Sequence, residues 1–241
     1  MMKKTISEIC DDPNFIDGIY NYCDRWCERC AFTSRCANFA LGNERFSDSE
    51  SNDLNNEEFW KTLSEIMAET KEMILQGAAE MGIDLNNLDE VVEMPSLNDT
   101  KSHLLIRLCM KYEEMAREWF TESFYVDQQT AELIDSRKIE LDDAIEVIHW
   151  YMFQIDVKLR RALLTLMEED EELSYEERNG SAKVALIGLD RSLEAWNVLL
   201  NMIKDRQKSI LDLITLLNRI KLIAEKQFPQ ARNFIRPGLD E

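Results

Sequence analysis

No proline occurs between Pro95 and Pro229, so more than half of the chain lacks the residue that interrupts helices most strongly. Glycine is also scarce, since only seven glycines and four prolines occur in 241 residues. A β-sandwich or barrel of this length needs many turns, and turns use both residues. We therefore expect an all-α fold, a helical bundle of five to seven helices with a small N-terminal metal-binding module.

Apolar residues recur at helical spacing in several stretches of the chain. The stretch 57–81 follows Asn56, a residue that caps helices well, and precedes Gly82, which is typical just after a helix end. A break is expected at Gly180. The expected helices cover residues 57–81, about 100–120, about 141–167, 181–202 and a last run that reaches Phe228, with a short helix near 128–136.

Two of the expected helices contain stretches that are apolar around most of their circumference. These stretches are residues 147–157 and 184–200. A helix that is apolar on all sides is normally central to its domain. The helices at 57–81 and 204–227 have wide polar faces instead, so we expect them on the outside of the bundle.

The net charge of −19 is concentrated in the middle of the chain. Residues 43–100 carry fifteen acidic and three basic side chains, and they open with a polar stretch. We expect three parts: a cysteine-rich metal-binding module at residues 1–42, an acidic linker at 43–56, and a helical bundle domain at 57–241. The end of the chain, after Pro229, is expected to dock on the bundle. Whether it also covers the cysteine module stays open.

The charge and the hydropathy pattern exclude several classes of protein. A strongly acidic surface repels phosphates, so we expect no nucleic-acid partner, whereas a basic protein partner suits the acidic surface. No run of eighteen apolar residues occurs, and the N-terminus lacks the apolar core of a secretory signal. We therefore expect no membrane span and a cytoplasmic location, where cysteines stay mostly reduced.

Four of the six cysteines fall within fourteen residues, in the sequence YCDRWCERCAFTSRC. If residues 15–30 form a helix, Cys23, Cys27 and Cys30 share one face and Cys36 returns to them from a loop. Four thiolates so close together repel one another unless a cation neutralises them. We therefore predict that Cys23, Cys27, Cys30 and Cys36 are the ligands of one metal centre.

The identity of the metal is less constrained than the ligands. The spacing resembles the cysteine runs that bind iron–sulfur clusters more than the paired knuckles of zinc ribbons, so a [4Fe–4S] cluster is slightly favoured over zinc. Three interleaved arginines offset the negative charge that either centre carries. Nearby aromatic side chains supply an apolar wall. The arginines are Arg25, Arg29 and Arg35, and the aromatic residues are Tyr22, Trp26, Phe32 and Phe39.

The remaining two cysteines are not expected to be ligands. Cys10 lies thirteen residues before the cluster and is expected to be a free thiol, with an additional ligand as the alternative. Cys109 lies on the inner face of its expected helix and is predicted to belong to the core.

A second candidate site lies in the helical body. Glu146 and His149 are spaced as one half of the ligand motif of ferritin-like di-iron bundles. No second such pair exists, because the chain has only two histidines. We therefore predict that His149 is buried and hydrogen-bonded, within a polar network in which Lys158 or Arg160 faces Asp190 or Glu194.

The same polar residues leave two other readings of the helical body open. One is a metal site of a bundle enzyme, in which carboxylates from the neighbouring helices join His149. These carboxylates are Glu113, Glu114, Asp190 and Glu194. The other is a ligand cavity walled by aromatic side chains. These side chains are Trp150, Tyr151, Phe153 and Trp196.

Three hypotheses on function follow from these patterns. The first is an iron–sulfur protein that uses the cluster at the four cysteines for electron transfer or redox sensing. The second is a zinc-stapled interaction protein without catalysis, and the third is a bundle enzyme or ligand-binding protein that uses Glu146 and His149. No nucleophile motif or phosphate-binding glycine loop occurs, so the sequence does not decide whether the chain is an enzyme.

Overall fold

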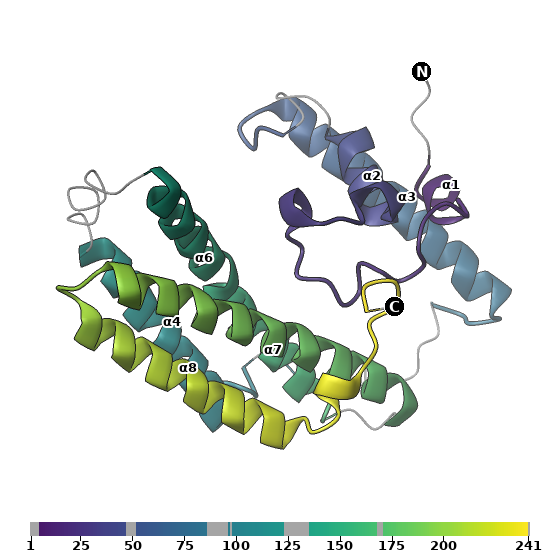
Figure 1. Ribbon diagram of the computed structural model, residues 1–241. Coiled ribbons are helices and arrows are strands. Elements are labelled where there is room, and N and C mark those ends of the chain that lie inside the picture. The colour runs from purple at the N-terminus through teal and green to yellow at the C-terminus, as the bar shows by residue number, and fades with distance from the viewer. Residues whose placement is uncertain are drawn as a thin grey trace. The chain divides into compact units, whose positions relative to one another are not determined.

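Helices make up all the regular secondary structure in the part of the chain that the structure, a computed structural model, describes. The described residues are 5–46, 52–85, 96, 98–122, 135–167 and 171–240. The predicted all-α fold is therefore confirmed for these residues. The α-helices among them are α1 (Ile6–Cys10), α2 (Ala37–Arg45), α3 (Glu57–Glu80), α4 (Leu104–Glu122), α6 (Asp135–Leu164), α7 (Glu171–Met202) and α8 (Gln207–Gln227) (Figure 1).

The chain divides into two compact units. The first contains residues 1–93 together with 236–241, and the second contains residues 94–235. Helix α3, which we expected at the start of the bundle domain, is therefore grouped with the cysteine segment. The expected linker also begins inside a helix, because residues 43–45 form the last turn of α2.

Helix α7 is the centre of the second unit. It packs along α6 on one side and α8 on another, and the short 3₁₀ helix η4 (Ala231–Asn233) also lies against it (Figure 1). In this core the Trp196 indole N–H donates to the Tyr112 hydroxyl at 3.0 Å, and both side chains are fully buried. The prediction that residues 184–200 lie centrally is consistent with this packing.

The predicted break at Gly180 is wrong, because α7 runs without interruption from Glu171 to Met202. Gly180 and Ser181 are buried inside the helix. Gly188 shows why small residues occur here: a Cβ atom at this position would lie 2.8 Å from the Tyr151 ring of α6. The small side chains therefore serve close packing of α6 against α7 and do not end a helix.

The ends of several helices agree with the sequence signals. The Asn56 side chain accepts a hydrogen bond from the Glu58 N–H at 3.0 Å, and Gly82 has a φ of +71° just after α3. At the start of α4, the Nδ1 atom of His103 accepts from the Leu105 N–H at 3.2 Å. The expected short helix near 128–136 lies mostly outside the described residues. The described residues resume at Asp135, where α6 begins.

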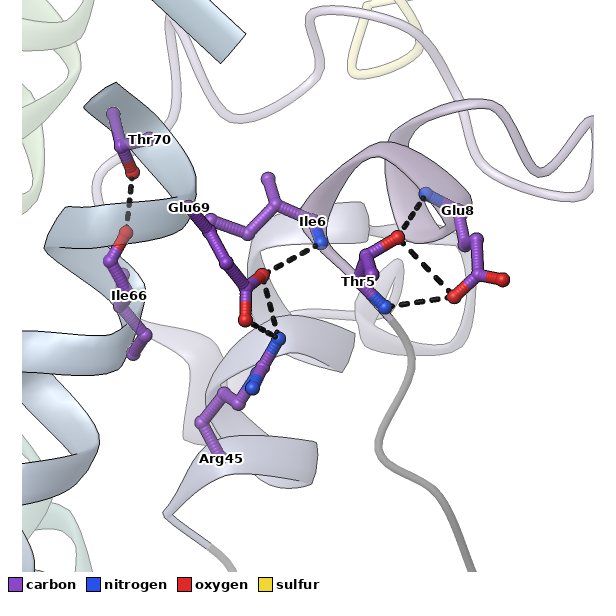
Figure 2. A network of polar contacts seen from close by, with 7 residues as sticks. All are labelled: Thr5, Ile6, Glu8, Arg45, Ile66, Glu69 and Thr70. Carbon is purple, nitrogen blue, oxygen red and sulfur yellow. Dashed lines mark hydrogen bonds and ion pairs between the residues drawn. The ribbon is translucent and has the colours of Figure 1, made fainter. Parts of the chain in front are cut away.

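The first unit is held together around one carboxylate. Glu69 of α3 accepts hydrogen bonds from the Arg45 guanidinium at the end of α2 and, at 3.2 Å, from the Ile6 N–H at the start of α1 (Figure 2). Thr5 and Glu8 form a reciprocal capping box that fixes the start of α1. Three helices distant in sequence therefore meet at Glu69.

Candidate metal centre

The segment that carries the four clustered cysteines is not a helix. Residues 11–26 form turns, and they are followed by the short 3₁₀ helices η1 (Cys27–Arg29) and η2 (Thr33–Arg35). The expectation of a helix over residues 15–30 is therefore wrong. Gly18 and Arg25 explain the difference, because both have a left-handed φ, of +66° and +60°, that a helix cannot contain.

The turns nevertheless bring the four cysteines to one place. Cys23, Cys27, Cys30 and Cys36 all line a single small cavity of about 30 Å³ in the first unit. Arg25 reverses the chain between the first two cysteines, and η1 and η2 separate the others. The side chains share this cavity because of the turns, and not because of the helical spacing on which we had based their convergence.

Apolar side chains form much of the cavity wall. Trp26, Phe32 and Phe39 line it as expected, and Trp26 is buried. Five lining residues were not anticipated from the sequence: Ile19, Tyr20, Asp24, Thr33 and Leu239. Ile19 and Tyr20 lie just before the cysteine cluster, so their position could have suggested them. The sequence left open whether the end of the chain covers the cysteine module, but it did not single out Leu239, which is separated from Cys36 by the whole of the second unit.

In the absence of a cation, the cavity favours the protonated form of the Cys27 thiol. Burial raises the pKa of Cys27, and repulsion from Cys23, Cys36, Glu28 and Cys30 raises it further. Burial also raises the pKa of Tyr20, with contributions from Cys10, Asp17 and Cys36. All four cysteine side chains are therefore close enough for the charge on one thiolate to affect another.

Backbone groups fix the orientation of several cysteines. The Phe32 N–H donates to the Cys30 Sγ at 3.4 Å, and the Cys23 thiol donates to the Tyr20 carbonyl at 3.5 Å. The Cys30 N–H donates to the Cys27 carbonyl at 3.2 Å and closes the turn between these two residues. An N–H group directed at sulfur stabilises a thiolate more than a thiol.

The expected arginines have different positions around the cavity. Arg25 lines it directly. The Arg29 guanidinium lies over the Trp26 ring, 4.1 Å from the ring centre, on the wall of the cavity. Arg35 contributes its backbone, since its carbonyl accepts from the Ile16 N–H at 2.9 Å.

The donor groups are not arranged as a finished coordination shell. In the described ranges, no three or more Cys, His, Asp or Glu side chains are placed so that they could hold a metal ion as they stand. All six cysteines are free thiols. Cys10 is exposed, and Cys109 is buried in the second unit, where burial raises its thiol pKa.

The structure around Glu146 and His149 differs from what we predicted for this alternative site. His149 is exposed, so the prediction of a buried histidine is wrong. One face of its ring stacks on Phe120 of α4, with ring centres 4.2 Å apart, and the loss of water at that face lowers the pKa of the imidazole. Glu146 is also exposed. Stacking on a neighbouring helix therefore explains the position of His149 without a ligand.

Asp190 of α7 and Arg160 of α6, two of the residues expected to face each other, have other partners. Asp190 of α7 pairs with Lys221 of α8 at 2.7 Å and with Arg232 of η4 at 2.5 Å. Arg160 of α6 pairs with Asp156 on its own helix at 2.6 Å and donates to Thr100 at 3.0 Å. Polar contacts between α6 and α7 do form, but through other residues: Arg161 pairs with Glu177, and Arg191 donates to the Tyr151 hydroxyl. Asp190 connects α7 to α8 and η4.

The proposed aromatic walls of a ligand cavity do not face a common space. Tyr151 and Trp196 are packed in the core, whereas Phe153 is exposed. The described helices also include none that is long and apolar enough to cross a membrane. Comparison with known protein families, with curated proteins and with solved structures finds no match to this chain.

Proposed function

We propose that Cys23, Cys27, Cys30 and Cys36 bind one metal ion that staples the first unit. The observation that carries this proposal is that all four thiols line the same cavity although turns separate them. Four reduced cysteines around one cavity are an unusual use of a scarce, reactive residue, whereas a shared cation makes their convergence favourable.

The donor set suits a single ion. Zn²⁺ accepts four thiolates in a closed tetrahedral shell, with Zn–S bonds of about 2.3 Å. Cys23, Cys27, Cys30 and Cys36 supply four such ligands from one cavity.

Proton release is a part of the proposed binding. The raised pKa of Cys27 means that this thiol is protonated at neutral pH until the cation displaces its proton. The N–H group that donates to the Cys30 Sγ then stabilises a bound thiolate, and Arg25 at the cavity wall offsets the excess negative charge. The metal affinity should consequently fall as the pH is lowered.

Helix α3 favours an interaction role for the stapled unit. Trp60, Met67, Ile74 and Met81 recur every seven residues along it and are 55%, 66%, 58% and 76% exposed. Exposed glutamates flank this row: Glu57, Glu58, Glu65, Glu72 and Glu80. An amphipathic helix with basic flanks is the partner that this surface fits. The function best supported is therefore a zinc-stapled interaction protein without catalysis.

An iron–sulfur protein is the second candidate function. It is favoured by the irregular cysteine spacing and by the buried side chains of Ile19 and Trp26, which limit the access of water to the centre. In that case the centre would transfer electrons or sense the redox state.

Metal analysis of the protein purified without oxygen tests the proposal and separates the two candidates. We expect one zinc per chain, retained in Cys10→Ser, an exposed cysteine outside the cavity, and lost in Cys27→Ser or Cys36→Ser. Iron with equimolar sulfide and absorbance at about 400 nm would favour the second candidate. Absence of any stoichiometric metal from the wild-type chain, also after reconstitution with Zn²⁺ or iron and sulfide, would refute both.

The interaction role has its own test. Met67→Glu and Ile74→Glu, which place charges in the exposed row of α3, should abolish capture of a basic amphipathic model helix by the zinc-loaded chain. Leu222→Glu is the matched control, because Leu222 is equally exposed on α8, at 68%. Equal capture by all three variants would exclude α3 as the interaction surface.

A further inference from the structure

Leu239 reaches the cysteine cavity from a short folded segment, residues 236–240. The Arg236 N–H donates to the Asp240 carboxylate at 2.9 Å, and the Arg236 guanidinium donates to the same carboxylate at 2.7 Å. The N–H groups of Leu239 and Asp240 donate back to the Arg236 carbonyl, at 3.1 and 3.2 Å. The segment is therefore a closed turn that presents Leu239 to the cavity.

The same segment packs on the loop that carries Cys36. Gly238 has a φ of +68°, and a Cβ atom there would lie 2.5 Å from the Ile16 side chain. Only glycine fits this approach, because any side chain would collide and would also strain the backbone. The Ile16 N–H in turn donates to the carbonyl of Arg35, the residue before Cys36. The contacts thus connect Gly238 to Cys36 through Ile16.

We propose that residues 236–240 are the lid of the cysteine centre, so that docking of this segment and metal binding stabilise each other. This inference rests on the metal centre proposed above. Leu239 supplies an apolar wall that keeps water and competing ligands from the metal–sulfur bonds. Metal binding in turn orders the loop around Cys36, on which Ile16 and Gly238 pack. The two effects are equal in size, because coupling between two binding events is reciprocal.

The lid has a consequence for the connection of the two units. The chain passes from the first unit to the second after residue 93 and returns to the first at Arg236. With the lid docked, the second unit is attached to the first at both of its ends. Loss of the metal should weaken the docking of the lid, and while the lid is undocked a single covalent connection remains.

The test measures how fast the full-length, zinc-loaded chain loses Zn²⁺ to a chromophoric chelator. Gly238→Ala is compared with Gly82→Ala, because Gly82 has a similar φ, of +71°, but open space around its Cβ position. Leu239→Gln is compared with Leu222→Gln, because the Leu222 side chain is exposed on α8. We expect zinc release to be about five- to tenfold faster in the two lid variants and unchanged in the two controls.

Hydrogen exchange gives a readout that does not depend on the release assay. The amides of Leu239 and Asp240 should exchange faster in the zinc-free chain than in the zinc-loaded chain. Equal zinc release by lid variants and controls would overturn the lid while leaving the cysteine centre intact. If Gly238→Ala fails to fold, Leu239→Gln decides the question. A wild-type chain that binds no Zn²⁺ would overturn the centre and the lid together.

Discussion

One nitrogen of the Arg45 guanidinium lies 2.8 Å from each of the two carboxylate oxygens of Glu69 (Figure 2). The Arg45 side chain is only 4% exposed, whereas that of Glu69 is 29% exposed. A guanidinium at this depth is stable mainly because of its counter-charge. The pair joins α2 to α3, and the Ile6 N–H brings α1 to the same carboxylate.

Removal of the Glu69 carboxylate should therefore destabilise the first unit. We expect Glu69→Ala to lower the free energy of unfolding of this unit by about 2–4 kcal/mol, since it takes away the counter-charge of a buried cation. Native-state hydrogen exchange of the α2 and α3 amides measures the effect. Glu58→Ala is the control on the same helix, because the Glu58–Lys61 pair is exposed and should contribute less than about 1 kcal/mol. Equal losses in both variants would contradict the role of Glu69.

Two glycines in helices should respond oppositely to the same substitution. Gly188→Ala should lower the free energy of unfolding of the second unit by about 1–3 kcal/mol, because the new Cβ would lie 2.8 Å from the Tyr151 ring. Gly77→Ala should raise the stability of α3 by about 0.5–1 kcal/mol, because nothing lies within 4 Å of its Cβ position. Urea denaturation and hydrogen exchange give the two values. A stabilising Gly188→Ala would show that α6 and α7 can separate at this point without cost.

The Asp190 carboxylate should contribute to stability only above the acid range. Although its partial burial opposes ionisation, hydrogen bonds from Arg232 and Lys221 lower the pKa of Asp190 below its usual value of 3.8. The contribution is thus complete above pH 3.8 and is lost as the pH falls through the lowered value. Asp190→Asn should cost about 1 kcal/mol at pH 7, because the groups are partly exposed, and less at lower pH. A cost that is constant from pH 7 to pH 2 would refute this account.

The stacking of His149 on Phe120 predicts a second loss of stability on acidification, at a pH closer to neutrality than the loss from Asp190. Because burial of one ring face lowers the pKa of His149 below 6.5, the unfolded chain binds more protons than the folded chain as the pH falls below that value. Stability should therefore decrease on acidification through this range, and His149→Gln should remove that decrease. Thermal unfolding of both proteins between pH 7.5 and about 5 measures it. An unchanged pH profile in the variant would assign the effect to another group.

Replacement of Cys27 by Ser should disorder the cysteine segment and leave the second unit folded. The second unit has its own core around the fully buried side chains of Tyr112 and Trp196. Circular dichroism should therefore retain most of its helical signal, while near-ultraviolet signals from Trp26 are lost. Loss of most of the helical signal would show that the second unit cannot fold without the first.

Helix boundaries were the part of the fold most accessible from the sequence. Asn56 and Gly82 mark the ends of α3 through local hydrogen bonds and backbone angles, which depend only on near neighbours in the chain. The predicted helix break at Gly180 was wrong for the opposite reason. Gly180 is buried inside the uninterrupted helix α7, and whether a glycine ends a helix or is buried within one depends on the surrounding packing, which no local pattern reveals.

The candidate site was predictable in its residues but not in its geometry. The density of cysteines identified the four thiols that line the cavity. A helical path was inferred from their spacing, but the left-handed φ of Arg25 gives a turn, and a non-glycine residue in that conformation leaves no signature in the sequence. The roles of Leu239 and Arg45 were not predicted. The contacts of Leu239 join segments that are far apart in the chain, and Arg45 belongs to a stretch that was expected to be a linker.

The first unit is discontinuous in the chain, since residues 236–241 complete a structure that residues 1–93 begin. During translation, the ribosome makes the cysteine loop before residues 94–235 and adds Leu239 only after them. While residues 94–235 are being made, the four thiols therefore lack this lining residue. Cleavage of the chain between the two parts of the first unit should expose the thiols under the proposed lid, although the cut lies far from them in the sequence.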